Sequence, residues 1–263
     1  NCTENEDDND SPTFDVNTVG FLAGADYRAD ARTTLGMTLG ADFGDAKIHN
    51  GGGKLETADW RLTGFVGKTV ADQAFFNAGA QFGTSDIDIK RKSVWGDPKG
   101  ETTAWNAGVF VEAGVLLPFS KTIAAMPYVG LAYTHTWVEH FREEGAGALW
   151  DVDTITADSL RGRIGCGFSW SFDASEMRWR LGLDVAYSHE CLGEETDVDA
   201  HYIDGKKLPT ITAKTLPSDM FSVGPTIDVG ISENASIYGG YSFNAGTDSS
   251  VNHSANVGFR MRF

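Results

Sequence analysis

The chain has 263 residues, a formal net charge of −16 and no cluster of Lys and Arg, a composition that argues against nucleic acid as a partner. No apolar run approaches the roughly 18 residues that a transmembrane helix needs, which leaves open a membrane barrel whose strands are apolar only at every second position. The 31 glycines against 7 prolines, with aromatic residues at 11%, favour a single domain built from many strands.

Apolar and polar residues alternate from Val16 to the C-terminus, which is the pattern of β-strands. In residues 19–28 one face is apolar and the other is mostly small or charged; the apolar face carries Val19, Phe21, Ala23, Ala25 and Tyr27, and the other Gly20, Leu22, Gly24, Asp26 and Arg28. Residues 35–44 repeat this pattern, and so do residues 105–117, 160–171 and 178–188.

Three features favour a membrane barrel over a soluble β-sandwich, which alternation alone also fits. The segments run for roughly ten or more residues, the span of a tilted transmembrane strand. Their polar faces mix charges with glycines, which suits a narrow, hydrated lumen. Short connections near 28–32, 69–73, 118–122, 172–177 and 232–235 alternate with longer ones near 49–56, 90–102, 139–155 and 192–216. The sequence therefore predicts an all-β, transmembrane, antiparallel up-and-down β-barrel.

The strand count comes to about eleven between Val16 and Phe263, and an antiparallel barrel needs an even number to close. The first and last of these strands run in the same direction, so they cannot pair antiparallel with each other. We expect one further strand upstream of Asn1, making about twelve, with residues 1–15 as an external loop and residues 16–263 as the barrel domain. A short extra strand within residues 13–17 is the alternative, which the acids and Pro12 disfavour. We also expect that a signal peptide, with anything between it and Asn1, has been removed or was not included.

Aromatic residues near the segment ends predict girdles at the two membrane interfaces: Tyr27, Trp60, Trp105, Tyr133, Trp170, Trp179 and Tyr187. The acids concentrate in the predicted loops, where they are solvated or contact divalent cations at a lipopolysaccharide surface.

No motif indicates an enzyme, a cofactor or a metal site. The six histidines lack metal-ligand spacing, and the loop residues Asp197, Asp199, His201 and Asp204 give only a weak hint of a barrel-edge hydrolase. Three cysteines, Cys2, Cys166 and Cys191, form no disulfide framework, although a bridge between Cys2 and Cys191 stays open.

The last eight residues alternate and end on an aromatic residue. They resemble the C-terminal β-signal by which outer-membrane proteins are recognised for insertion, a mode of recognition that uses strand addition. The resemblance implies a barrel assembly machinery as partner, and the signal residues would be Val257, Phe259, Met261 and Phe263.

The wider pattern resembles the autotransporter β-domain of type V secretion. The resemblance rests on the Gly-rich segment 20–28, on residues 35–40 after it, and on segments 158–162, 186–189, 237–241 and 258–263 in the family's order. It implies a pore of about twelve strands that carries a covalently linked N-terminal passenger to the cell surface. Lumen-facing charges are then candidates for gripping the threading segment, or they pair across the lumen and keep it hydrated: Arg28, Arg61, Glu112, Arg161, Arg163, Arg178, Arg180, Asp184, Arg260 and Arg262.

We therefore expect a non-enzymatic translocator in the outer membrane, in contact with lipid and lipopolysaccharide. It should be a monomeric barrel with a periplasmic C-terminus and extracellular long loops. The alternative is a stand-alone porin, or a surface adhesin that binds through the acidic loops.

Overall fold

The computed structural model describes residues 2–5, 14–49, 52–93, 95–193, 195–214 and 217–263, and these residues form strands, turns and bends. Eleven long strands make most of one sheet: β2 (Phe14–Arg28), β3 (Thr33–Ile48), β4 (Gly53–Thr69), β5 (Ala74–Arg91), β6 (Lys99–Val115), β8 (Ile123–Val138), β11 (Ile155–Ala174), β12 (Met177–Glu190), β16 (Asp219–Gly230), β17 (Ala235–Gly246) and β18 (Ser250–Met261). Among the described residues no helix is long and apolar enough to cross a membrane.

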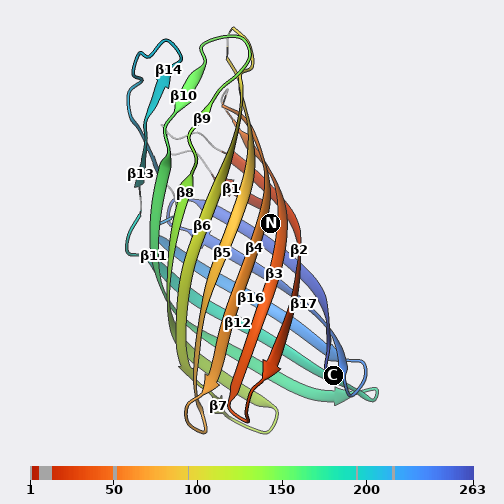
Figure 1. The fold of residues 1–263 in the computed structure, drawn as a ribbon. Helices are drawn as coiled ribbons and strands as arrows, with labels where there is room; N and C mark the ends of the chain where they lie inside the picture. The colour runs from red at the N-terminus through yellow and green to blue at the C-terminus, as the bar shows by residue number, and fades with distance from the viewer. Residues whose placement is uncertain (1, 6–13, 50–51, 94, 194, 215–216) are drawn as a thin grey trace.

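The long strands pair antiparallel with their neighbours in chain order, and the sheet curls into a barrel. After a two-residue strand, β7 (Leu117–Pro118), β8 pairs with both β6 and β11, which joins the two halves of the sheet. Figure 1 shows the strands wrapping around one lumen. The predicted all-β, antiparallel up-and-down architecture is confirmed, and the count of eleven strands after residue 13 agrees with the sequence.

A short twelfth strand lies between the first and last long strands. β1 (Cys2–Asn5) pairs antiparallel with β18, Cys2 lying opposite His253, and with β2, Cys2 lying opposite Asn17. β2 and β18 run in the same direction, so only a strand of opposite direction can join them. The boundary expected at residue 15 is therefore wrong in two respects: residues 2–5 are strand, and β2 begins at Phe14 because its first residues find partners in β3. The rest of the expected loop, residues 6–13, lies outside the described residues.

Below β1 the barrel has a seam. The part of β2 from Val19 to Arg28 and the part of β18 from Ser254 to Met261 have no sheet partner on the sides that face each other, within the described residues. Each edge presents backbone N–H and C=O groups that a further strand could pair with.

The two ends of the barrel differ, and we call them the turn end and the loop end. The turn end, at the bottom of Figure 1, holds the connections 29–32, 70–73, 119–122, 175–176 and 231–234, and the C-terminus. The loop end, at the top, holds the long connections 139–154 and 191–218, which carry small sheets of their own. The predicted long connection at residues 49–56 is in fact short, because β3 continues to Ile48 and β4 already begins at Gly53.

The turns are explained by local chemistry. Ser175 and Glu176 both have positive φ, 53° and 63°, as a two-residue hairpin turn of type I′ requires. In the turn 29–32 the Asp30 carboxylate accepts a hydrogen bond of 2.6 Å from the backbone N–H of Arg32. This bond is the main reason that the pKa of Asp30 lies below its usual value.

Two small sheets extend the loop end. β10 (Trp150–Val152) pairs with β9 (Phe141–Arg142) and β14 (Ala200–Tyr202), and β13 (Glu195–Val198) pairs with β15 (Ile211–Lys214). The connections 139–154 and 191–218 therefore brace each other through the β10–β14 pairing.

Candidate functional site: the barrel lumen

Contacts that bridge non-adjacent strands identify the lumen face of the sheet. The Tyr128 hydroxyl on β8 donates to both carboxylate oxygens of Asp184 on β12, at 3.0 and 2.9 Å, although β11 lies between these strands. Side chains can reach across an intervening strand only on the concave side of a curled sheet. Arg163 on β11 joins them with an ion pair of 2.7 Å to Asp184.

Gly165 on β11 makes this lumen cluster possible. A Cβ atom at Gly165 would lie 2.5 Å from the Tyr128 hydroxyl oxygen, so any side chain there would displace the tyrosine. Phe65 lies over Gly36, and Tyr238 lies over Gly258, in the same way. The many glycines of the polar faces thus give room to rings from neighbouring strands.

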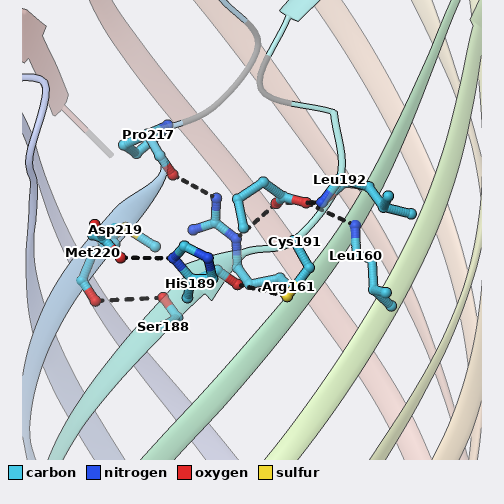
Figure 2. Close-up of polar contacts among 11 residues, drawn as sticks. Leu160, Arg161, Ser188, His189, Cys191, Leu192, Pro217, Asp219 and Met220 are labelled. Atoms are coloured by element: carbon cyan, nitrogen blue, oxygen red, sulfur yellow. Dashed lines mark hydrogen bonds and ion pairs between the residues drawn. The ribbon is translucent and has the colours of Figure 1, made fainter.

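A second lumen cluster ties the barrel wall to the long connection 191–218 (Figure 2). The Glu190 side chain is fully buried at the loop end of β12. Its carboxylate accepts hydrogen bonds from the Ser159 hydroxyl at 2.8 Å, from the backbone N–H groups of Leu160 and Leu192 at 2.7 and 3.3 Å, and from Arg161 Nε at 3.3 Å. Arg161 also donates to the Pro217 carbonyl at 3.1 Å, so it links β11 to both ends of the connection.

Other predicted lumen charges lie in single pairs on the same face. Arg61 contacts Asp42 at 3.5 Å, and Glu112 accepts a hydrogen bond of 3.1 Å from Asn77. At the turn end, Arg178 contacts Asp173 and Arg260 contacts Asp228, each at 3.6 Å. The Arg260 guanidinium also lies 5.3 Å from the centre of the Tyr238 ring, within cation–π range.

Three of the ten predicted charges have neither a counter-ion nor a side-chain hydrogen bond within the described part of the chain. Arg28, Arg180 and Arg262 make no side-chain hydrogen bond or ion pair among the residues that the structure describes. All three belong to the turn end. Arg180 and Arg262 line a cavity of about 800 Å³ there, together with Arg178, Arg260 and Asp228.

Sequence reasoning missed several partners of the charges that it predicted. Asp42, Tyr128, Glu190, Asp228 and Tyr238 all complete lumen contacts and were not singled out. The alternation signal could have found them, since each occupies the same parity as the lumen residues of its own strand. What hid them is that the pattern near Tyr128 and Tyr238 places a large ring on the face expected to be small or charged.

The outward face is an apolar belt bordered by aromatic side chains. Mid-strand residues such as Leu131, Ile164 and Leu183 are exposed there. On β12, Tyr187 lies near the loop end and Trp179 near the turn end, eight residues apart. At about 3.3 Å per residue and a tilt of about 40°, this separation spans roughly 20 Å along the barrel axis, close to the height of a membrane-facing band.

Tyrosine hydroxyl groups mark the loop-end border of the belt. Tyr133 donates to Asp158 at 2.6 Å, and His135 contacts the same oxygen at 2.8 Å. Tyr187 donates to Asp219 on the neighbouring strand β16 in the same arrangement. Rings turned toward lipid with their hydroxyls toward polar groups are typical of membrane interfaces.

The proposed insertion-signal residues also lie on the outward face. Val257 and Phe259 pair with Gly239 and Ile237 on β17, and Val257 is 81% exposed. Met261 and Phe263 are exposed as well.

Among the described loop residues, Asp151 makes ion pairs with Arg142 and His140. In the loop-end sheet, hydrogen bonds from Arg142 and then from His140 hold the pKa of Asp151 below its usual value. No group of three or more His, Cys, Asp or Glu within the described ranges could hold a metal ion. Cys191, directly after the end of β12, is an exposed free thiol, and β16, β17 and β18 separate β12 from β1, which carries Cys2, so the bridge left open by the sequence is not formed.

A family model described as "Autotransporter beta-domain" matches residues 3–242 of the chain. A curated relative, an extracellular serine protease of Serratia marcescens, is 24% identical over 97% of this chain, and the match covers 24% of the relative. The chain thus spans about a quarter of the length of that relative.

Solved structures share the fold. The translocator domain of the autotransporter NalP from Neisseria meningitidis has a TM-score of 0.80 at 17% identity, covering 100% of this chain and 85% of that one. The β-domain of the Bordetella autotransporter BrkA has a TM-score of 0.69 at 15% identity, covering 100% of this chain and 96% of that one. The transport unit of AIDA-I from Escherichia coli has a TM-score of 0.59 at 12% identity, covering 100% and 88%. With the family model matching most of its length, the chain belongs to the autotransporter β-domain family.

Proposed function

We propose that this outer-membrane barrel anchors and exports a passenger that is covalently linked upstream of Asn1. The observation that carries the proposal is the direction of β1. It runs from the turn end toward the loop end between β2 and β18, so a segment preceding Cys2 arrives from the turn end, next to the open seam and the lumen.

The upstream segment completes the barrel in this proposal. A strand continuing β1 in the same register could pair with β2 as far as Arg28 and with β18 as far as Met261. The added strand would lengthen β1 into a twelfth strand long enough to cross the membrane. Residues 16–263 then supply the other strands, and the passenger passes through the lumen beyond this strand.

The orientation follows from the same arrangement. The turn end, with the C-terminus, faces the periplasm, and the long connections face the cell exterior, as tight periplasmic turns and longer outer loops predict. The barrel is a monomer, and its apolar belt contacts lipid and lipopolysaccharide. The barrel assembly machinery recognises Val257, Phe259, Met261 and Phe263. The ten lumen charges bind the threading segment or keep the pore hydrated. The barrel itself is not an enzyme.

The test is protease treatment of intact cells that make the full precursor with an epitope tag upstream of Asn1. Export predicts that the tag is lost on shaving. A second tag in the connection 203–206 should be lost too, while a tag in the turn 231–234 should survive in intact cells and be lost only after lysis. A protected upstream tag would refute export and favour a stand-alone porin or adhesin.

A further inference from the structure

The loop-end sheet of β9, β10 and β14 has one apolar face and one charged face (Figure 1). On the apolar face Val152 and Ala200 are buried, and the Arg91 guanidinium lies 3.8 Å from the centre of the Trp150 ring. Successive residues of a strand point to opposite faces, so the residues between these turn the other way. We call that side the ionic face, because the side chains there pair as ions.

Permanent cations neutralise two of the three carboxylates that the described residues place on the ionic face. Arg142 donates to one oxygen of Asp151 through two nitrogens, at 3.0 and 2.5 Å, and His140 contacts the other oxygen at 2.5 Å. Lys207 contacts Asp199 at 3.3 Å. Each of these pairs lies within one connection, 139–154 or 191–218, so neither pair holds the two connections together.

The third carboxylate depends on a histidine from the other connection. Asp153 belongs to the connection 139–154, and its only counter-ion within the described ranges is His201 on β14, with 3.7 Å between Oδ2 and Nδ1. Register places His201 directly opposite Asp151, and the backbone N–H of Asp153 donates to the Asp199 carbonyl at 3.0 Å. The His201 ring therefore faces the carboxylates of the neighbouring connection.

The other charged groups beside His201 do not take its place. Lys207 lies opposite His201 across an isolated bridge, but Asp199 engages its ammonium group. Asp204 and Lys206 have opposite charges and lie in the turn after β14, where the Asp204 carboxylate accepts a hydrogen bond from the backbone N–H of Lys206. With the histidines neutral, the ionic face has three anions and two permanent cations, so one carboxylate stays uncompensated.

We infer that His201 is a pH-sensitive brace between the two long connections at the loop end. Histidine changes its charge between pH 5 and 8, whereas aspartate ordinarily stays ionised down to about pH 4. Protonated His201 pairs with Asp153 and holds β14 against β10. Neutral His201 leaves Asp153 uncompensated, so the pairing of the two strands opens more often. The brace is therefore tightest near pH 5, and it loosens both at higher pH and where the carboxylates become protonated.

The inference rests on the proposed function in one respect, since an outward-facing loop end exposes the brace to the pH of the external medium. It goes beyond export, because the brace sets how firmly the connection 191–218 is held beside the barrel wall. Arg161 and Glu190 fix this connection at its two ends, whereas His201 lies near its middle.

The test is hydrogen exchange of the purified 263-residue chain in detergent micelles, measured by mass spectrometry on peptides that contain residues 149–153 and 199–203. Exchange at about pH 5.5 and at about pH 8 is corrected by the rate of an unstructured reference peptide at the same pH. The side chains of His201 and Asp153 are 35% and 55% exposed. An exposed ion pair of this kind predicts protection that is roughly twofold to fivefold higher at the lower pH.

Three variants assign the response to this contact. His201→Gln removes the titratable charge, and Asp153→Asn removes its partner, so each should show the same low protection at both pH values. His201→Lys keeps a positive charge throughout and should show the higher protection at both, which separates a lost response from a lost fold. His49→Gln is the matched control: His49 is also partly exposed and contacts Asp15 at 2.9 Å, but it lies beside β3, and this variant should keep the wild-type response.

Equal protection at both pH values in the unmodified chain, or a pH response that survives in His201→Gln, would overturn the inference. The cell-shaving experiment described above separates this result from the proposed function. If the upstream tag is exported but the pH response is absent, the brace is refuted and export stands. If the response is present but the tag stays protected, export is refuted while the brace stands.

Discussion

Replacing Glu190 tests whether one buried carboxylate secures the loop-end connection to the barrel wall. Glu190 is fully buried and accepts four hydrogen bonds, two at each oxygen. In Glu190→Gln only one oxygen remains, and the amide nitrogen faces two donors. Each hydrogen bond to a charged group contributes about 1.5–3 kcal/mol, so we expect the free energy of unfolding to fall by about 3 kcal/mol.

Glu190→Ala should cost about 3–5 kcal/mol, because it leaves Arg161, whose side chain is 18% exposed, without its counter-ion. The assay is equilibrium unfolding by guanidinium in detergent micelles, followed by tryptophan fluorescence. Tryptic cleavage at Lys206 and Lys207 gives a local readout, since both lie in the connection that Glu190 and Arg161 hold.

Glu195→Gln is the matched control, since this glutamate is exposed on β13, and it should change stability by less than about 0.5 kcal/mol. The reasoning fails if Glu190→Gln unfolds at the wild-type midpoint and its connection is cleaved no faster. Such a result would mean that the carboxylate contacts do not stabilise the folded barrel.

Three further changes probe the faces and the loops. Gly165→Ala should lower the free energy of unfolding by about 1–3 kcal/mol, because the added methyl group displaces Tyr128. Gly64→Ala, with open space around it, should leave the free energy of unfolding unchanged in the same assay. Equal losses for the two variants would refute the packing argument. Leu183→Lys, on the outward face, should lower the free energy of unfolding in a lipid bilayer by about 2–4 kcal/mol. Thr226→Lys, at similar depth on the lumen face, should lower it much less. The reverse order would mean that the outward and lumen faces are assigned the wrong way round. Asp151 has a lowered pKa in the folded state, so its contribution to loop-end stability is complete above its unfolded pKa of about 4 and is lost as pH falls through the folded pKa. Asp151→Asn should remove that acid-dependent loosening, measured by hydrogen exchange of residues 139–154; unchanged exchange across this pH window in the wild type would contradict it.

Much of the architecture could be read from period-two alternation. A one-residue change of register would exchange the two faces of a strand, so a sequence with one apolar and one polar face specifies both its strands and their orientation. Strand β11 is an example, with Arg161 and Arg163 on its polar face and Ile164 and Phe168 on its apolar face. The direction of the first and last strands likewise required an intervening strand, which β1 begins to supply.

The tertiary structure alone decided how the lumen charges are partnered. Tyr128 and Asp184 are 56 residues apart in sequence, and they meet because a glycine on the strand between them leaves room for the ring. Likewise the sequence does not distinguish Glu190 from the exposed Glu195, since both are glutamates. Barrel closure buries the Glu190 side chain against β11. Alternation fixes the face on which a side chain lies, whereas curvature and strand order determine which charges meet across the lumen and leave Arg28, Arg180 and Arg262 without a partner among the described residues.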